Sequence, residues 1–220
     1  MKVSIIVPML NEAEQIADRL QHLKQTQSGE YEIIVVDGGS SDSSVELARQ
    51  YVDQVITSPR GRALQMNAGA ACSQADTLLF LHADTVLPDN VVDLLDDVAH
   101  SWGWFTVHLS GDDFMFRIIE VMMNLRSRLT SVATGDQAIF VSRSLFNKLG
   151  GFPEIALMED IALSKILRKL SSPICKKQQV VTSSRRWQQH GIFKTILLMW
   201  WLRVLYVFGV SPARLAKLYR

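Results

Sequence analysis

The alternation of short apolar runs with amphipathic segments over residues 1–82 constrains the fold of this chain more than any other feature. Four runs rich in β-branched and other apolar residues predict strands at 3–8, 32–37, 54–58 and 77–82. The segments between them predict helices at 11–23, 41–52 and 62–73, with Asn11 as the N-cap of the first helix. Continuously apolar strands that alternate with helices are typical of a mostly parallel sheet covered on both faces. The chain is therefore expected to have an α/β fold.

The second half of the chain is less regular. It predicts strands at 104–110 and 136–142 and helices at 114–130 and 159–170. No repeat or low-complexity linker interrupts these elements, and 220 residues suit one compact domain. The expected organisation is a single domain over residues 1–190, followed by a C-terminal helical segment over 191–220 that packs on the domain or on a membrane surface.

Cysteine usage and the N-terminal sequence indicate the compartment. Cys72 and Cys175 lie far apart in no metal-like spacing, which fits a reducing compartment. The apolar run that follows Met1 is too short for a signal peptide or a membrane span. We therefore expect a cytoplasmic protein that could bind peripherally to the inner face of the cell membrane, and we expect no nucleic-acid partner.

Polar residues cluster where three of the predicted strands end. In parallel α/β sheets, ligands bind outside the carboxyl ends of the strands. The residues at these ends are Pro8, Asn11 and Glu12 after the first strand, Asp37 and Gly38 after the second, and His82, Ala83 and Asp84 after the fourth. The sequence therefore predicts a ligand site at this edge of the sheet.

Six stretches, in this order along the chain, resemble the family 2 glycosyltransferases. They are SIIVPMLNEAEQI, EIIVVDGGSSD, FLHAD, TGDQAIFVSRSLFNKLGGFPE, MED and SSRRW. The resemblance covers roughly residues 1–190 and implies the GT-A fold, a single Rossmann-like α/β/α sandwich with a mostly parallel central sheet and, here, a C-terminal helical tail. Two positions depart from the family pattern. His82 stands at the first position of the DxD metal motif, and Ser183 stands where the QxxRW element often has glutamine.

The resemblance implies a nucleotide-sugar donor, with UDP as the family's usual nucleotide. The donor-binding residues that we expect are Pro8, Asn11, Glu12, Asp37, Gly38, Arg62, His82, Ala83 and Asp84. The carboxylate of Asp37 can accept hydrogen bonds from base N–H groups, and Arg62 could reach the diphosphate. Two alternatives stay open, because Glu12 could serve only the dipole of the first helix and Arg62 could lie in a solvated turn.

A departing diphosphate needs a neutralising charge, which a divalent cation supplies as a Lewis acid. Mn²⁺ or Mg²⁺ prefers carboxylate and phosphate oxygens. The resemblance implies Asp84 as a metal ligand, and His190 is the candidate for a second one. His82 has three open roles: it could contact the ribose, bind a softer metal such as Mn²⁺, or hydrogen-bond its own loop.

The acceptor hydroxyl must lose its proton as it attacks the anomeric carbon. The resemblance implies that Asp160 is the base of an inverting displacement, and that Glu159 orients it or binds the acceptor. Acids in the first turn of a helix also favour the helix dipole, which is the local alternative. The acceptor-side or sugar-binding residues that we expect are Gly135, Asp136, Gln137, Arg186 and Trp187. Trp187 could stack on a sugar or base, or serve as a structural anchor.

The C-terminal part of the chain is basic and apolar. Residues 161–220 contain 12 Lys or Arg and no Asp or Glu, whereas the first 160 residues contain 11 basic and 22 acidic residues. The segment 192–210 is apolar nearly all round, but Lys194 and Arg203 interrupt it. It could form a buried or homodimer-interface helix, a helix in an anionic membrane surface, or a lid over the acceptor site. The basic charge favours the membrane surface.

The sequence therefore predicts an inverting glycosyltransferase that uses a divalent cation and transfers a sugar to a glycan or lipid-linked acceptor. The alternative is a catalytically inactive nucleotide-sugar-binding or membrane-tethering protein, which the histidine in the DxD position supports. The retained Asp84, Glu159 and Asp160 argue against it. A dinucleotide oxidoreductase is disfavoured, because the first strand–helix turn lacks the G-x-G-x-x-G pattern.

Overall fold

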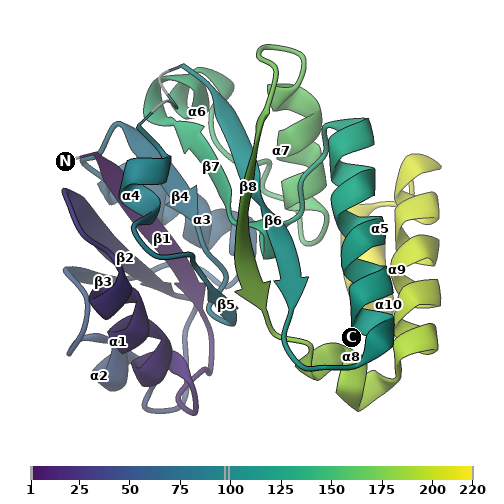
Figure 1. The fold of residues 1–220 in the computed structure, drawn as a ribbon, viewed down its shortest axis with the longest axis horizontal. Coiled ribbons are helices and arrows are strands. Elements are labelled where there is room, and N and C mark those ends of the chain that lie inside the picture. The colour runs from purple at the N-terminus through teal and green to yellow at the C-terminus, as the bar shows by residue number, and fades with distance from the viewer. Residues whose placement is uncertain (1, 97, 99, 220) are drawn as a thin grey trace.

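The computed structural model describes residues 2–96, 98 and 100–219. Over these residues, eight strands form one sheet in the order β3-β2-β1-β4-β7-β6-β8-β5 (Figure 1). The strands are β1 (Val3–Met9), β2 (Tyr31–Asp37), β3 (Gln54–Thr57), β4 (Thr77–Phe80), β5 (Thr85–Val86), β6 (Trp102–Leu109), β7 (Ile139–Ser142) and β8 (Ile174–Thr182). The first four are parallel to one another, β7 is antiparallel to β4 and β6, and β8 runs parallel to β6. The sheet is thus mostly parallel, as expected.

Helices cover the sheet and extend beyond one end of it (Figure 1). They are α1 (Ile16–Thr26), α2 (Ser44–Ala48), α3 (Arg62–Cys72), α4 (Val91–Leu94), α5 (Phe114–Thr130), α6 (Arg143–Leu149), α7 (Glu159–Leu167), α8 (Arg185–His190), α9 (Ile192–Val207) and α10 (Pro212–Tyr219), with a 3₁₀ turn at Gly135–Gln137. The α/β fold class is therefore confirmed.

Two apolar layers hold the helices against the two faces of the sheet. On one face, Ile5 and Val35 pack with Leu20 of α1. On the other face, Ile6 and Ile34 pack with helix α3. Successive strand residues point to opposite faces, so a strand buried on both sides is apolar at most of its positions. Each fully buried aliphatic side chain contributes about 1.5–3 kcal/mol of transfer free energy.

The first helix begins later than the sequence predicts, and the expectation that Asn11 is its N-cap is wrong. Helix α1 starts at Ile16, and Asn11 has a left-handed backbone with φ of 53°. The backbone N–H of Asn11 donates to Ser40 Oγ at 2.9 Å, and its side-chain oxygen accepts from the N–H of Ser41 at 2.8 Å. Asn11 thus joins the loop after β1 to the loop after β2 instead of capping a helix.

The C-terminal segment packs on the rest of the chain through α9 and α10. Leu202 and Leu215 are fully buried, in a cluster with Val132, Met158 and Ile161. Figure 1 shows α9 and α10 next to α5, at the end of the molecule away from α1. No helix within the described residues is long and apolar enough to cross a membrane.

Candidate active site

A cavity of about 300 Å³ lies at the carboxyl ends of β1 and β4 and beside the start of α3. It is lined by Pro8, Met9, Leu10, Glu12, Arg60, Gly61, Arg62, Gln65, His82, Ala83 and Asp84. Six of the nine expected donor residues line it, from segments up to 76 positions apart in sequence. The topology thus brings together the strand ends that the sequence singled out.

The other three expected donor residues shape the adjoining loops. The Asp37 carboxylate accepts hydrogen bonds from Gly39 N at 3.0 Å and from Ser40 N at 3.1 Å, and only 4% of the residue is exposed. Asn11 ties the first loop to the second, as described above. A Cβ on Gly38 would lie 3.0 Å from the side-chain amide nitrogen of Gln65. These residues therefore fix the loops at the edge of the cavity.

Gln65 is a cavity residue that sequence reasoning missed. Its side-chain amide donates to Met9 O at 2.9 Å and to Val36 O at 2.8 Å, and it is buried. It thereby binds carbonyls at the ends of two neighbouring strands, and Met9 O also accepts from Gly38 N at 2.9 Å. The signal in the sequence was a polar residue on the core face of the helix that begins at residue 62.

Two carboxylates share the cavity. Burial raises the pKa of Glu12, Arg185 opposes this shift, and the nearby charge of Asp84 adds to it. Glu12 Oε2 lies 4.0 Å from Arg185 Nη2. Hard cations such as Mg²⁺ and Mn²⁺ take carboxylate ligands, so this pair fits a divalent cation that is also held by phosphate oxygens.

The protein itself does not complete a metal cage in the described part of the chain. No group of three or more His, Cys, Asp or Glu side chains is placed there to hold a metal ion. His190, the candidate second ligand, is an exposed residue at the end of α8. Asp84 and His190 therefore do not belong to a preformed metal site with three protein ligands among the described residues.

The ring of His82 faces the 3₁₀ turn that carries Gly135 and Asp136. His82 Nδ1 lies 3.6 Å from Asp136 Oδ1, and a Cβ on Gly135 would clash with the ring. Glycine at 135 therefore leaves room for the imidazole. Burial alone would raise the pKa of Asp136, but the hydrogen bond and charge of His82 and the charge of Arg62 lower it below its usual range.

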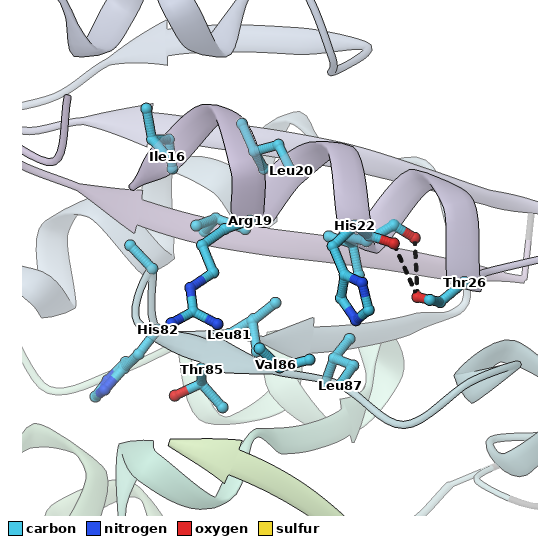
Figure 2. Close-up of a pocket in the computed structure, with 13 residues that line it drawn as sticks. Ile16, Arg19, Leu20, His22, Thr26, Leu81, His82, Thr85, Val86 and Leu87 are labelled. Atoms are coloured by element: carbon cyan, nitrogen blue, oxygen red, sulfur yellow. Dashed lines mark hydrogen bonds between the residues drawn. The ribbon is translucent and has the colours of Figure 1, made fainter. Parts of the chain in front are cut away.

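Figure 2 shows the side of the turn at residues 82–85 that faces helix α1. A small cavity of about 10 Å³ lies between α1 and residues 81–87, and Arg19 extends from α1 toward that turn. The ring of His82 points away from α1, which agrees with its contact to Asp136. This cavity is about the size of one water molecule and too small for a sugar nucleotide. A wider cavity of about 420 Å³ between α1 and α8 is lined by none of the expected site residues.

Asp160 and Glu159 begin helix α7 next to the same 3₁₀ turn. Asp160 Oδ2 accepts a hydrogen bond from Gly135 N at 2.8 Å, and Oδ1 accepts from Ile161 N at 2.7 Å. Asp160 is partly exposed, whereas Glu159 is buried. Burial and the charge of Asp160 raise the pKa of Glu159. Of the two carboxylates, Asp160 is the one that a substrate can reach.

We predict that Glu159→Gln stabilises the protein at neutral and alkaline pH. The folded-state pKa of Glu159 is raised above its ordinary value of 4.5, so the wild type loses stability as pH rises through that raised pKa. Glutamine does not titrate, and its advantage should vanish below the ordinary pKa. Thermal unfolding of both proteins between about pH 4 and pH 8 checks this. The control is Glu46→Gln, an exposed residue of α2. An advantage for Glu159→Gln that does not change with pH contradicts the prediction.

Arg186 contacts the last residue of α10, and Trp187 packs on β6 and α5. The Arg186 guanidinium lies 3.7 Å from the ring centre of Tyr219, and Nη2 donates to Tyr219 O at 2.9 Å. Trp187 packs against the cluster of Leu109 and Phe116, in agreement with the structural-anchor alternative. Tyr219 was not foreseen. Burial raises the pKa of Tyr219, and the charges of Arg62 and Arg186 oppose this shift.

Gln137, the last expected acceptor-side residue, holds the 3₁₀ turn in place. Its side-chain oxygen accepts from Ser127 Oγ at 2.7 Å and from Thr134 N at 3.1 Å. It is fully buried, and its amide nitrogen is without a hydrogen-bond partner among the described residues. Gln137 is thus placed to fix the turn that carries Gly135 and Asp136.

The sequence model of glycosyl transferase family 2 matches residues 4–146. The chain belongs to this family. An uncharacterized glycosyltransferase of Haemophilus influenzae is 29% identical over 179 residues, which are 76% of this chain and 58% of that protein. The undecaprenyl-phosphate 4-deoxy-4-formamido-L-arabinose transferase of Salmonella choleraesuis is 31% identical over 152 residues, which are 61% of this chain and 46% of that protein. The family 2 chain described here thus spans about half the length of these curated relatives.

Solved structures support the fold assignment for this family 2 member. TarS of S. aureus in complex with UDP-GlcNAc superposes with a TM-score of 0.67 at 18% identity, over 83% of this chain and 58% of that one. The mannosyltransferase PcManGT of Pyrobaculum calidifontis, in complex with GDP-Man and Mn²⁺, superposes with a TM-score of 0.63 at 23% identity. The match covers 82% of this chain and 56% of that one. The GT-A fold expected from the sequence is confirmed.

Proposed function

We propose that this family 2 chain is an inverting glycosyltransferase that moves a sugar from a nucleotide-sugar donor to a hydroxyl group of an acceptor. One observation carries the proposal. The cavity at the strand ends and the carboxylates of α7 meet at the 3₁₀ turn, because His82 of the cavity contacts Asp136 and Asp160 accepts the N–H of Gly135. A donor in the cavity would thus have its reacting sugar near a partly exposed carboxylate.

The donor would lie along the three strand ends. Asp37 would bind the base, and Arg62, at the start of α3, would face the diphosphate. The solved structures contain TarS in complex with UDP-GlcNAc and PcManGT in complex with GDP-Man. These complexes support a nucleotide sugar as the donor class. We propose UDP as the nucleotide, from the family's usual preference.

The residues present fit a divalent cation next to the diphosphate. Asp84 would hold it, with the carboxylate of Glu12 near by, and a bound cation would neutralise the charge of the leaving diphosphate. PcManGT with Mn²⁺ supports this choice of ion. In our interpretation HAD stands in place of DxD. Asp84 keeps the metal-binding position, while His82 orients Asp136 on the acceptor side.

Asp160 would act as the base. The acceptor oxygen would form its bond to the anomeric carbon while the bond from that carbon to the diphosphate oxygen breaks. The acceptor proton would pass to Asp160, whose second oxygen stays bonded to Gly135 N. One displacement of this kind inverts the anomeric configuration. Glu159, buried behind it, would hold Asp160 in position through helix α7.

We propose a glycan or lipid-linked acceptor. The Salmonella relative carries undecaprenyl phosphate in its name, which supports the lipid-linked class. An inactive nucleotide-sugar-binding protein is the weaker interpretation, because it gives no role to a partly exposed Asp160 beside the donor cavity. We further propose that residues 1–190 form the catalytic domain, on which residues 191–220 pack.

Calorimetric titration with a panel of nucleotides and nucleotide sugars tests the donor site. We expect one nucleotide class to bind in the presence of Mn²⁺ or Mg²⁺ and to bind at least about 10-fold more weakly in EDTA, because diphosphate and carboxylates repel each other without the cation. Slow release of nucleoside diphosphate from the matching nucleotide sugar would show turnover. Failure of every nucleotide to bind would refute the proposed function.

A further inference from the structure

We propose that helices α5 and α9 together form a face that binds an anionic lipid bilayer. In the described part of the chain, 16 large hydrophobic side chains are exposed, and 13 of them lie on these two helices or at the C-cap of α9. The set, here called the α5–α9 face, is Phe114, Ile118, Val121, Met122, Leu125, Leu129, Phe193, Leu197, Trp200, Trp201, Val204, Val207 and Phe208. Among the described residues outside this face, the exposed large hydrophobic side chains are those of Ile166, Leu170 and Leu218.

The residues of this face form one stripe on each helix. From Phe114 the exposed positions on α5 recur at intervals of three or four residues as far as Leu129, and on α9 they recur in the same way from Phe193 to Phe208. This is the spacing of one side of an α-helix. The stripes are strongly exposed: Leu129 is 76% and Phe208 is 81% accessible.

The two helices contact each other through their other sides. Phe116 and Ile119 of α5 form a buried cluster against which Ile192 and Ile196 of α9 pack. Figure 1 shows the two helices next to each other at one end of the molecule. Helix α9 also packs on α10 through Leu202. The inner sides thus have partners and the outer sides do not, so an apolar partner outside the described chain would be stabilised by covering them.

Charge and composition identify that partner as an anionic bilayer. Residues 161–220 carry 12 basic and no acidic residues. Exposed basic side chains next to the stripes are those of Arg128 on α5 and Lys194 on α9. Each basic residue near an anionic membrane contributes about 1 kcal/mol of attraction. A second copy of this chain would instead bring two basic segments together, which like-charge repulsion disfavours.

The aromatic content fits the membrane interface. Trp200 and Trp201 are more than half exposed, together with Phe193 and Phe208. Tryptophan is favoured at the boundary between headgroups and acyl chains, and a helix with an apolar outer face lies in that plane without spanning it. This agrees with the finding that the described helices do not reach the length and hydropathy of a span.

The same helix α9 also borders the proposed acceptor side, and this part of the inference rests on the proposed function. Leu202 of α9 is buried in one cluster with Met158 and Ile161, which flank Glu159 and Asp160 in the chain. Arg126 of α5 has a buried Nε without a hydrogen-bond partner among the described residues. A bilayer on the α5–α9 face would therefore present a lipid-linked acceptor next to Asp160.

Flotation with lipid vesicles tests the bilayer as the partner, without any donor or acceptor present. We expect the full chain to float with vesicles of phosphatidylcholine and phosphatidylglycerol, to bind vesicles of phosphatidylcholine alone at least about 10-fold more weakly, and to be released by high salt. The fluorescence of Trp200 and Trp201 should shift to the blue on binding. Failure here with intact nucleotide binding would refute the bilayer and leave the proposed function standing.

Matched variants connect binding to the face. Leu197→Gln on α9 and Phe114→Gln on α5 should each weaken vesicle binding about 10-fold or more, since each removes a large apolar contact. Leu170→Gln is the control, because Leu170 is 48% exposed and lies outside the face. Circular dichroism and thermal unfolding confirm that the variants are folded.

Three outcomes would overturn the proposal. The first is equal binding of the wild type to neutral and anionic vesicles. The second is unchanged binding of both face variants. The third is a concentration-dependent dimer, seen by light scattering, that Leu197→Gln dissociates while no vesicles are bound. In that last case a second copy of the chain covers the face.

Discussion

Asp160→Asn should reduce turnover by about 100- to 10,000-fold, the usual contribution of a positioned general base. Asparagine has the same shape, and its side-chain oxygen can still accept the Gly135 N–H that Asp160 Oδ2 accepts at 2.8 Å, although the bond from Ile161 N to Oδ1 is lost. It cannot take a proton from the acceptor. The variant should therefore keep the 3₁₀ turn and the donor cavity while losing the chemical step. Release of nucleoside diphosphate from the donor sugar, followed with time, measures the loss.

Two comparisons separate the base from a structural anchor. Nucleotide affinity of Asp160→Asn should match the wild type within about twofold, because the donor cavity is unchanged. Asp18→Asn, at an exposed carboxylate of α1, should keep full turnover. Full turnover by Asp160→Asn would mean that this carboxylate only anchors Gly135 and that the proton leaves by another route.

The parallel half of the fold could be predicted because its signals are local. Every residue of β1 is buried, and all of them except the hydrogen-bonded Ser4 are apolar, as expected for a strand covered on both faces. The ends of these strands meet at one edge through topology alone, so the donor residues could be grouped from sequence order. His82, Ala83 and Asp84 line the same cavity as Pro8 and Glu12 for this reason.

The second half of the fold could be predicted only in part, because it depends on tertiary contacts that no local sequence pattern indicates. Strand β8 was not predicted, because its central residues Lys177, Gln178 and Gln179 are exposed and polar. Its pairing with β6 is fixed by tertiary structure and contains a register shift. The contact of Arg186 with Tyr219 likewise joins α8 to α10, which the sequence did not resolve as separate helices.

The contact of His82 and the exposed side of α5 could not be predicted either, because both depend on tertiary contacts. Histidine can be a ligand, a contact or a loop partner, and only the tertiary contact of its ring with Asp136 shows that it faces the 3₁₀ turn. The helix at 114–130 was predicted correctly. Which of its sides would be left uncovered could not be predicted, because that depends on where α9 packs.

Asp84→Asn should abolish the cation-dependent part of nucleotide binding. The amide removes one of the two carboxylate charges in the cavity and leaves Glu12, whose charged form burial already disfavours. Loss of a hard-cation ligand should weaken nucleotide binding in Mn²⁺ by about 10- to 100-fold. Calorimetric titration of the nucleotide in Mn²⁺ and in EDTA, for both proteins, measures this difference.

The EDTA titration makes the test of Asp84 specific. Without the cation, the variant should bind the nucleotide at least as well as the wild type, because one negative charge next to the diphosphate is gone. Asp89→Asn, an exposed residue beyond β5, should behave as the wild type in both conditions. If Asp84→Asn instead weakened binding equally in Mn²⁺ and in EDTA, the carboxylate would contact the nucleotide directly. If the substitution changed nucleotide binding neither in Mn²⁺ nor in EDTA, the HAD sequence would mark a site without a metal. The charge of the leaving diphosphate would then be neutralised by Arg60 and Arg62, which line the same cavity.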